Sequence, residues 1–191
     1  IHDLLMASDT LWYATDSGLF PAPLATPFAW RHRTDAPPTS INTLALDSKG
    51  SLWMGTAAQG LIRKRGSKVK TYDRSAGLQS LAVESVVLDA YENLWLGTKQ
   101  GIHLVELDVL QEQVLSIRAY GPDDGFIGLE SLPCATLLDR DSSLWFGTVR
   151  GAIRYDARQV VEDPKEPLIH LTDLQLFYEK PDWSPWCTGF G

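Results

Sequence analysis

Short runs in which apolar and polar residues alternate recur along most of the chain, with turn-forming residues between them. The runs come in groups that repeat along the chain. The second group predicts four short strands, at residues 41–46, 52–56, 61–64 and 69–72. Residues 47–50 (Asp-Ser-Lys-Gly) are typical of a turn, and Gly66-Ser67 is typical of a tight hairpin. The third group repeats the pattern at 83–88, 94–98, 102–107 and 114–120. Helical periodicity is not convincing anywhere, so the chain is predicted to be all-β.

Four of the seven tryptophans lie in one motif, Leu-Trp-x-(Gly/Ala)-Thr. They are Trp12, Trp53, Trp95 and Trp145, which are 41, 42 and 50 residues apart. Three of them follow an aspartate by six residues (Asp47, Asp89 and Asp139), whereas the first copy has Met6 at that place. A glycine follows each motif (Gly18, Gly60, Gly101 and Gly151). A period of about forty residues with four short antiparallel strands indicates the blades of a β-propeller.

Each residue type in the motif has a physical reason. The tryptophan is expected to fill the wedge between adjacent blades, and the small residue two places later leaves room for a neighbouring side chain. The later glycine allows a backbone conformation that a Cβ would penalise. Residues 74–78 and 122–126 are predicted to lead from the outer edge of one blade to the inner strand of the next. The predicted fold is a propeller fragment of about four four-stranded blades.

The motif Asp-x-x-Gly-x-Leu-Trp-x-Gly-Thr, as it stands at residues 47–56, resembles the two-component regulator propeller repeat. Residues 166–176 resemble the first strand of the immunoglobulin-like domain named for three tyrosines, which follows such propellers. The resemblance implies a partial propeller over residues 1–165 and the truncated start of a β-sandwich over residues 166–191. Propellers of that family have seven blades, so the remaining blades lie upstream in the native protein, or fragments associate.

The same resemblance implies a function. The chain is expected to be a fragment of the ligand-sensing ectodomain of a bacterial two-component sensor or regulator. It would be periplasmic or extracellular, belong to an inner-membrane protein and recognise a carbohydrate or another small ligand. A histidine kinase would follow it, so the fragment itself is not expected to be an enzyme. A passive protein-interaction scaffold and a propeller enzyme, either glycan-active or a quinoprotein, are the alternatives.

Composition narrows the partners. The net charge is −7 and the pI is about 5.0, which argues against nucleic acid or an anionic membrane surface because both require a basic patch. The densest basic stretch, Lys64, Arg65 and Lys68, is expected at a hairpin turn. No apolar run approaches the roughly 20 residues that cross a bilayer, so this segment is not expected to contact the membrane.

Few residues suggest chemistry. The four histidines (His2, His32, His103 and His170) lack the spacing of metal ligands, and no cofactor, metal site or catalytic residue is predicted. Residues 139–143 are interpreted as a blade turn, because they lack the rest of a calcium motif. Trp30, Arg31 and His32 form an aromatic and polar cluster outside the repeat and are the candidate ligand-binding residues, unless Trp30 packs an irregular blade edge.

The two cysteines, Cys134 and Cys187, do not have the spacing of a zinc site or redox motif. Cys134 lies in a predicted strand, so it is expected to be a buried free thiol. A disulfide with Cys187 is the alternative in an oxidising compartment.

Overall fold

The structure, a computed structural model, describes residues 1–25, 37–108, 113–126 and 130–156. The chain divides into the units Ile1–Arg158 and Gln159–Gly191, and the second unit lies outside the described residues. The predicted sandwich strand at 166–176 therefore also lies outside them, as do Trp30, Arg31, His32 and Cys187.

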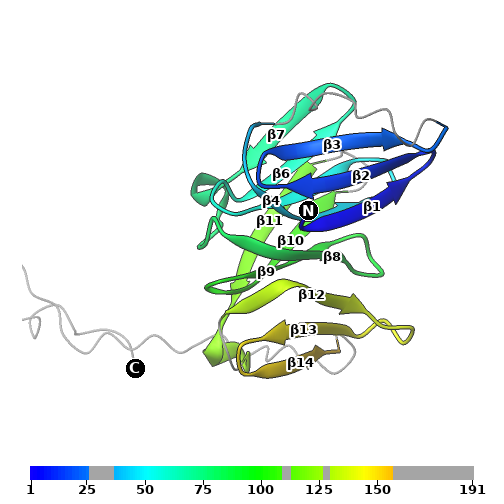
Figure 1. The fold of residues 1–191 in the computed structure, drawn as a ribbon. Helices are drawn as coiled ribbons and strands as arrows, with labels where there is room; N and C mark the ends of the chain where they lie inside the picture. Colours follow the sequence, from blue (N-terminus) through cyan, green and yellow to red (C-terminus); the bar gives the residue numbers. More distant parts are fainter. Residues whose placement is uncertain (26–36, 109–112, 127–129, 157–191) are drawn as a thin grey trace, which may run out of the picture. The chain divides into compact units, whose positions relative to one another are not determined.

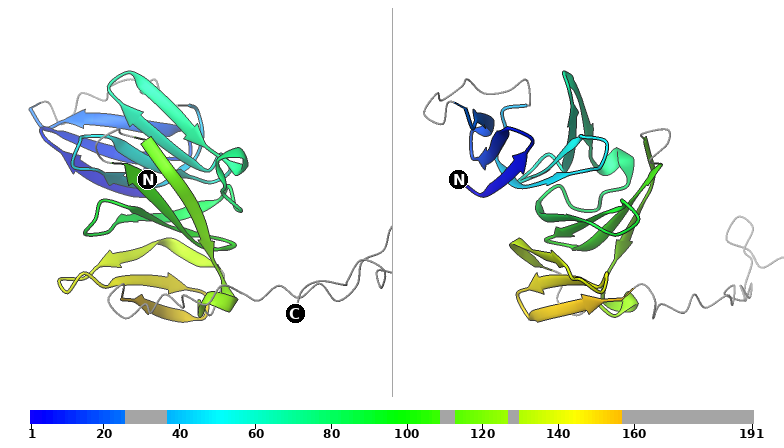
Figure 2. Two further views of the ribbon diagram at one scale, coloured as in Figure 1. Left: turned by 180° about the vertical axis from the view of Figure 1, so that it is seen from behind. Right: turned by 90° about the vertical axis from the view of Figure 1, so that its right-hand side faces the viewer.

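The described residues form four antiparallel sheets, which are called the first to fourth blades (Figures 1 and 2). The first blade holds β1 (Asp3–Ala7), β2 (Thr10–Thr15) and β3 (Gly18–Pro23), and the second holds β4 (Ile41–Leu46), β5 (Leu52–Thr56), β6 (Leu61–Arg65) and β7 (Lys68–Tyr72). The third holds β8 (Val83–Leu88), β9 (Leu94–Thr98), β10 (Gly101–Asp108) and β11 (Gln113–Tyr120), and the fourth holds β12 (Ser131–Leu138), β13 (Leu144–Thr148) and β14 (Gly151–Tyr155).

The all-β propeller prediction is confirmed, and none of the sheets formed by the described residues is closed. The second and third blades have the predicted four strands, and the other two have three strands among the described residues. Strand bounds in the second and third blades agree with the pattern to within one residue at each end. The basic residues also lie where the sequence places them, since Arg65 pairs with Lys68 across the two-residue turn Gly66-Ser67.

The first strands of the blades pack against one another along the chain. β1 contacts β4, β4 contacts β8, and β8 contacts β12, while β12 also contacts β4. The connectors predicted at 74–78 and 122–126 contain short 3-10 helices, η1 (Arg74–Ala76) and η2 (Pro122–Asp124). Each is followed by a glycine with positive φ and then by a buried apolar residue, Leu78 or Phe126. The buried side chain at the end of each connector thus fixes the connector where the chain passes to the next blade.

Trp53 and Trp95 lie between blades as predicted. Trp53 is fully buried and packs with Val83 and Leu94 of the third blade. Trp95 packs in the same way with Leu144 and Phe146 of the fourth blade. Each layer between two blades is therefore a separate hydrophobic cluster, formed by the facing sides of two successive sheets.

The threonine that ends each motif has a repeated role that the sequence did not reveal. Its hydroxyl donates to the carbonyl of the glycine that follows the motif, as in Thr56 to Gly60 at 2.8 Å and Thr98 to Gly101 at 2.8 Å. The same hydroxyl accepts a backbone N–H of the turn, from Gln59 or Gln100. The predicted unusual backbone of these glycines is confirmed, because Gly18, Gly60, Gly101 and Gly151 all have positive φ.

Close packing leaves no room for a Cβ at the glycines two places after Trp53, Trp95 and Trp145. A Cβ built at Gly97 would lie 2.3 Å from the Ser85 Oγ and 2.8 Å from the Ser131 Cβ of the next blade. Ala in place of Gly97 is therefore expected to destabilise the fold by about 1–3 kcal/mol through overpacking, measured by chemical denaturation. Adding Ser85→Ala removes the nearest atom and should recover part of the loss, whereas strict additivity would argue against the clash.

The prediction that Cys134 is buried is wrong. Cys134 lies on β12, as the pattern indicates, but it is exposed and free. Its φ of 51° and the register shift between Ser131 and Thr136 mark an irregularity in the strand. That irregularity breaks the alternation of inward and outward side chains on which the prediction of burial rested.

Candidate functional site

The turn between the first two strands of a blade is held by its aspartate. The Asp47 carboxylate accepts the backbone N–H groups of Lys49 (3.0 Å) and Ser51 (2.7 Å) with one oxygen and the Trp53 indole N–H (3.0 Å) with the other. The tryptophans of the third and fourth blades donate to Asp89 (3.0 Å) and Asp139 (3.2 Å) in the same way. The six-residue spacing of Asp and Trp is therefore a hydrogen-bonding requirement of each blade.

The first blade shows why its copy lacks the aspartate. Ala7 pairs directly with Thr10, so only Ser8 and Asp9 separate β1 from β2. The later blades place five residues in this turn, as between Leu46 and Leu52. The shorter turn leaves no segment for a carboxylate to bind, which explains Met6 at the equivalent place. The assignment of residues 139–143 to a turn is confirmed, because the Asp139 N–H donates to the Ser143 carbonyl at 2.8 Å.

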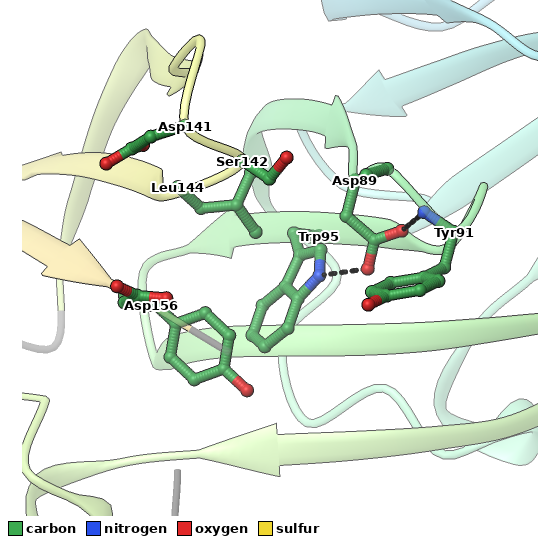
Figure 3. Close-up of a pocket in the computed structure, with 9 residues that line it drawn as sticks. Asp89, Tyr91, Trp95, Asp141, Ser142, Leu144 and Asp156 are labelled. Carbon is green, nitrogen blue, oxygen red and sulfur yellow. Dashed lines mark hydrogen bonds between the residues drawn. The ribbon is translucent and has the colours of Figure 1, made fainter. Parts of the chain in front are cut away.

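A cavity of about 170 Å³ lies between the turns of the third and fourth blades (Figure 3). Its lining comes from the Asp89 turn, the Asp141 turn and the end of β14, and comprises Asp89, Ala90, Tyr91, Trp95, Asp141, Ser142, Leu144, Tyr155 and Asp156. Figure 3 shows Ser142 and Leu144 on one side and Asp89, Tyr91 and Trp95 on the other. The cavity is thus formed by two blades together and exists only when both are folded.

The walls of the cavity combine aromatic rings with carboxylates. Tyr91 is 75% exposed, whereas Trp95 is almost fully buried. The Tyr155 ring lies 4.6 Å from the Trp95 ring between centroids, and burial raises the pKa of its hydroxyl. At the cavity edge, hydrogen bonds from Ser143 and Arg154 lower the pKa of Asp141 to about 2, so this carboxylate is ionised at neutral pH.

The hydrogen bonds within this lining limit what it can do. Asp89 accepts from the backbone of Tyr91 and Asn93 and from the Trp95 indole, and its role is therefore mainly structural. Arg154 donates to Asp141 at 2.6 Å and lies 4.0 Å from Asp156. Aromatic faces beside a few polar groups are features of sites that bind small molecules.

A second group of polar residues lies along the first strands. The Asn42 side chain donates to the Val83 carbonyl (3.1 Å) and to the buried Glu84 carboxylate (3.3 Å) of the third blade. Asp3 accepts from the Leu44 backbone at 2.7 Å. These contacts join successive blades, and their donors and acceptors are engaged with each other.

The residues predicted from the sequence and those found in the structure differ. Trp30, Arg31 and His32 lie outside the described residues and stay a prediction. The cavity was missed, although aligning the turns of the repeat shows a signal, because Ser142 stands where the preceding blade has Glu92. In the described part of the chain, no group of three or more His, Cys, Asp or Glu side chains is placed to hold a metal ion. No helix among the described residues is long and apolar enough to span a membrane.

The sequence of the chain is similar to a known family of repeats and to a known protein. The sequence profile of the two component regulator propeller family matches residues 35–58, which contain the second Leu-Trp motif. Histidine kinase P4 of Formosa agariphila is 29% identical over 122 residues, which cover 63% of this chain and 8% of that protein. The chain thus spans less than a tenth of the curated relative that it matches.

Solved structures share the fold. The extracellular domain of the hybrid two-component system BT3049 of B. thetaiotaomicron aligns with 94% of this chain and 26% of its own length, at a TM-score of 0.69 and 16% identity. Virginiamycin B lyase of Staphylococcus aureus aligns with 82% of this chain and 55% of its own length, at a TM-score of 0.56 and 16% identity. Residues 35–58 thus match the two component regulator propeller family, and the chain shares its propeller fold with the extracellular domain of a hybrid two-component system.

Proposed function

We propose that this chain is part of the ligand-sensing ectodomain of a bacterial two-component sensor or regulator, lying in the periplasm or outside the cell. The single observation that carries the proposal is the profile match of the repeat at residues 35–58 to the two component regulator propeller family. The similarity to a histidine kinase over 63% of the chain supports it. The ligand is a carbohydrate or another small extracellular molecule.

Exposed apolar side chains on the outer blades support further propeller contacts. Leu4 and Met6 are exposed on β1, on the face opposite Leu5, which packs onto the second blade. Leu137 is exposed on β12 beside Trp145, on the face opposite Phe146. Further blades, or a second copy of the chain, would cover these faces as the third blade covers Trp53.

Signal transmission runs through the segment that follows the fourth blade. Residues 166–191 would begin a sandwich domain, and ligand binding would change how the propeller sits on it. A ligand shifts such an equilibrium only if its affinity differs between the two arrangements. The strand that starts near Leu168 would carry this change.

The test uses the intact receptor. Calorimetry of its ectodomain with oligosaccharide fragments should show saturable binding, and a disulfide that locks the propeller–sandwich junction should abolish the ligand-dependent response. Response that persists in the locked receptor would contradict the mechanism. Binding confined to a protein partner would favour a scaffold, and turnover of a glycan would favour an enzyme, a class to which the lyase with the same fold belongs.

A further inference from the structure

One side chain closes the space between the second and third blades at their turns. Glu92 reaches back from the third blade, and its carboxylate accepts the backbone N–H of Ser48 in the second blade at 3.0 Å. Glu92 stands three residues before Trp95, in a left-handed backbone conformation with a φ of 69°. The corresponding residue of the second blade, Gly50, has a φ of 79°.

The same position between the third and fourth blades is left open. Ser142 stands three residues before Trp145 with a φ of 67°, and thus matches Glu92 in place and backbone. Its short side chain makes no hydrogen bond within the described part of the chain, and it lines the cavity. Ala90 matches Ser48, and none of the described residues accepts a hydrogen bond from its N–H. The cavity therefore occupies the place that the Glu92 side chain fills in the preceding pair of blades.

At two further positions, a tyrosine stands where the preceding blade has another residue, and both tyrosines line the cavity. Tyr91 stands where the second blade has Lys49, and Tyr155 stands where the third blade has Val105. The opening thus combines a backbone donor that lacks an acceptor with two tyrosine rings. Tyr155 also packs on Trp95 in the layer between the two blades, whereas Tyr91 is 75% exposed.

The charges around the cavity select the kind of ligand. Three carboxylates (Asp89, Asp141 and Asp156) and one guanidinium (Arg154) surround it, so an anion is disfavoured. An ammonium ion carries donors only, so it cannot accept a hydrogen bond from the Ala90 N–H. A hydroxyl group meets both demands, because it accepts from a backbone N–H and still donates to a lone pair of a carboxylate.

We propose that the cavity between the third and fourth blades binds a single neutral, hydroxyl-rich ring, such as one monosaccharide unit. A ring oxygen or hydroxyl accepts from the Ala90 N–H, in the place of the Glu92 carboxylate, and the C–H faces of the ring lie against Tyr91 and Tyr155. The volume of about 170 Å³ is below the ~300–1,000 Å³ of pockets for larger ligands, which fits one ring. This inference rests on the proposed ligand-sensing function and assigns it a site.

The experiment titrates the isotope-labelled chain with a panel of neutral methyl monosaccharides and follows its backbone amide NMR signals. At least one sugar should shift the amides of Ala90, Tyr91 and Ser142 saturably. Ser142→Glu should fill the cavity and weaken this binding by about tenfold or more, because Glu supplies the missing acceptor itself. Glu92 shows that glutamate is tolerated at this φ, so the variant should fold and unfold like the wild type.

Three controls separate the explanations. Ser142→Ala keeps the space and should retain binding, while Glu92→Gln changes a carboxylate in the other blade pair and should leave binding unchanged. Tyr91→Ala removes an exposed ring and should weaken binding without loss of stability, which provides a test if Ser142→Glu does not fold.

Shifts of these amides by choline but not by sugars, or no shift with any sugar up to its solubility limit, would overturn the proposal. In the intact receptor, a normal response of the Ser142→Glu variant would reject this cavity as the sensing site while leaving the sensor function standing. If the wild-type receptor shows no ligand-dependent response, the sensor function itself is rejected.

Discussion

Alanine in place of Trp53 is expected to lower the free energy of unfolding of this chain by about 3–5 kcal/mol. Trp53 is fully buried, its indole donates to Asp47 at 3.0 Å, and its ring packs against Val83 and Leu94 of the next blade. The substitution leaves a cavity between two blades. It also removes the indole N–H that donates a hydrogen bond to the Asp47 carboxylate. Because small domains are stable by only about 5–15 kcal/mol, the loss should be evident in denaturant unfolding followed by fluorescence.

Trp145 is the matched control for this prediction. It stands in the same motif and donates to Asp139 at 3.2 Å, but it is only half-buried and no described blade covers its outer face. Trp145→Ala should therefore cost less in this chain, about 1–2 kcal/mol. Equal losses for the two variants would show that interblade burial is not what the repeated tryptophan contributes.

Acid is expected to destabilise the fold through His103. Its ring is buried in the third blade, its Nε2 accepts the Gln79 backbone N–H at 3.2 Å, and its Nδ1 has no partner among the described residues. Burial lowers the pKa of His103 from 6.5 to about 4. The unfolded chain therefore binds this proton more tightly than the folded chain.

The sign of the effect follows from this difference. Between pH 6.5 and about 4 the unfolded state carries more protons, so stability falls as the pH falls through this window. The total loss is about 3 kcal/mol, since each pKa unit corresponds to about 1.4 kcal/mol. Above pH 6.5 this histidine is neutral in both states and contributes no pH dependence.

Denaturation curves recorded from neutral pH to about pH 4 would measure the effect. His103→Gln removes the titrating group and should flatten the dependence on pH in this window, even if it lowers stability overall. A slope that His103→Gln does not alter would place the acid sensitivity elsewhere in the chain.

The repeat made much of the fold predictable. Alternating apolar residues and the recurring Leu-Trp motif place the strands of the second and third blades within one residue, because each blade repeats one local pattern of turns and pleated segments. The positive φ of Gly18, Gly60, Gly101 and Gly151 was predictable for the same reason. The sequence could not show that Cys134 is exposed, since a local irregularity of β12 breaks the alternation there.

The candidate site was less predictable. The aspartate before each tryptophan was recognised as part of a turn, but its hydrogen bond to the indole appears only when strand and turn are placed in space. Trp30, Arg31 and His32 were selected because they are aromatic and polar residues outside the repeat. The cavity instead lies among repeat residues. There, a site can be recognised only from the positions at which one copy of the repeat differs from another.

The sequence by itself determined the blades, because the residues of a strand and its turns are neighbours in the chain and their periods are written locally. The tertiary structure decided what lies between the blades. Glu92 reaches the Ser48 N–H, and Ser142 does not span the corresponding distance to Ala90. That difference depends on how far a side chain extends from one sheet to the next, and only packed sheets define this distance.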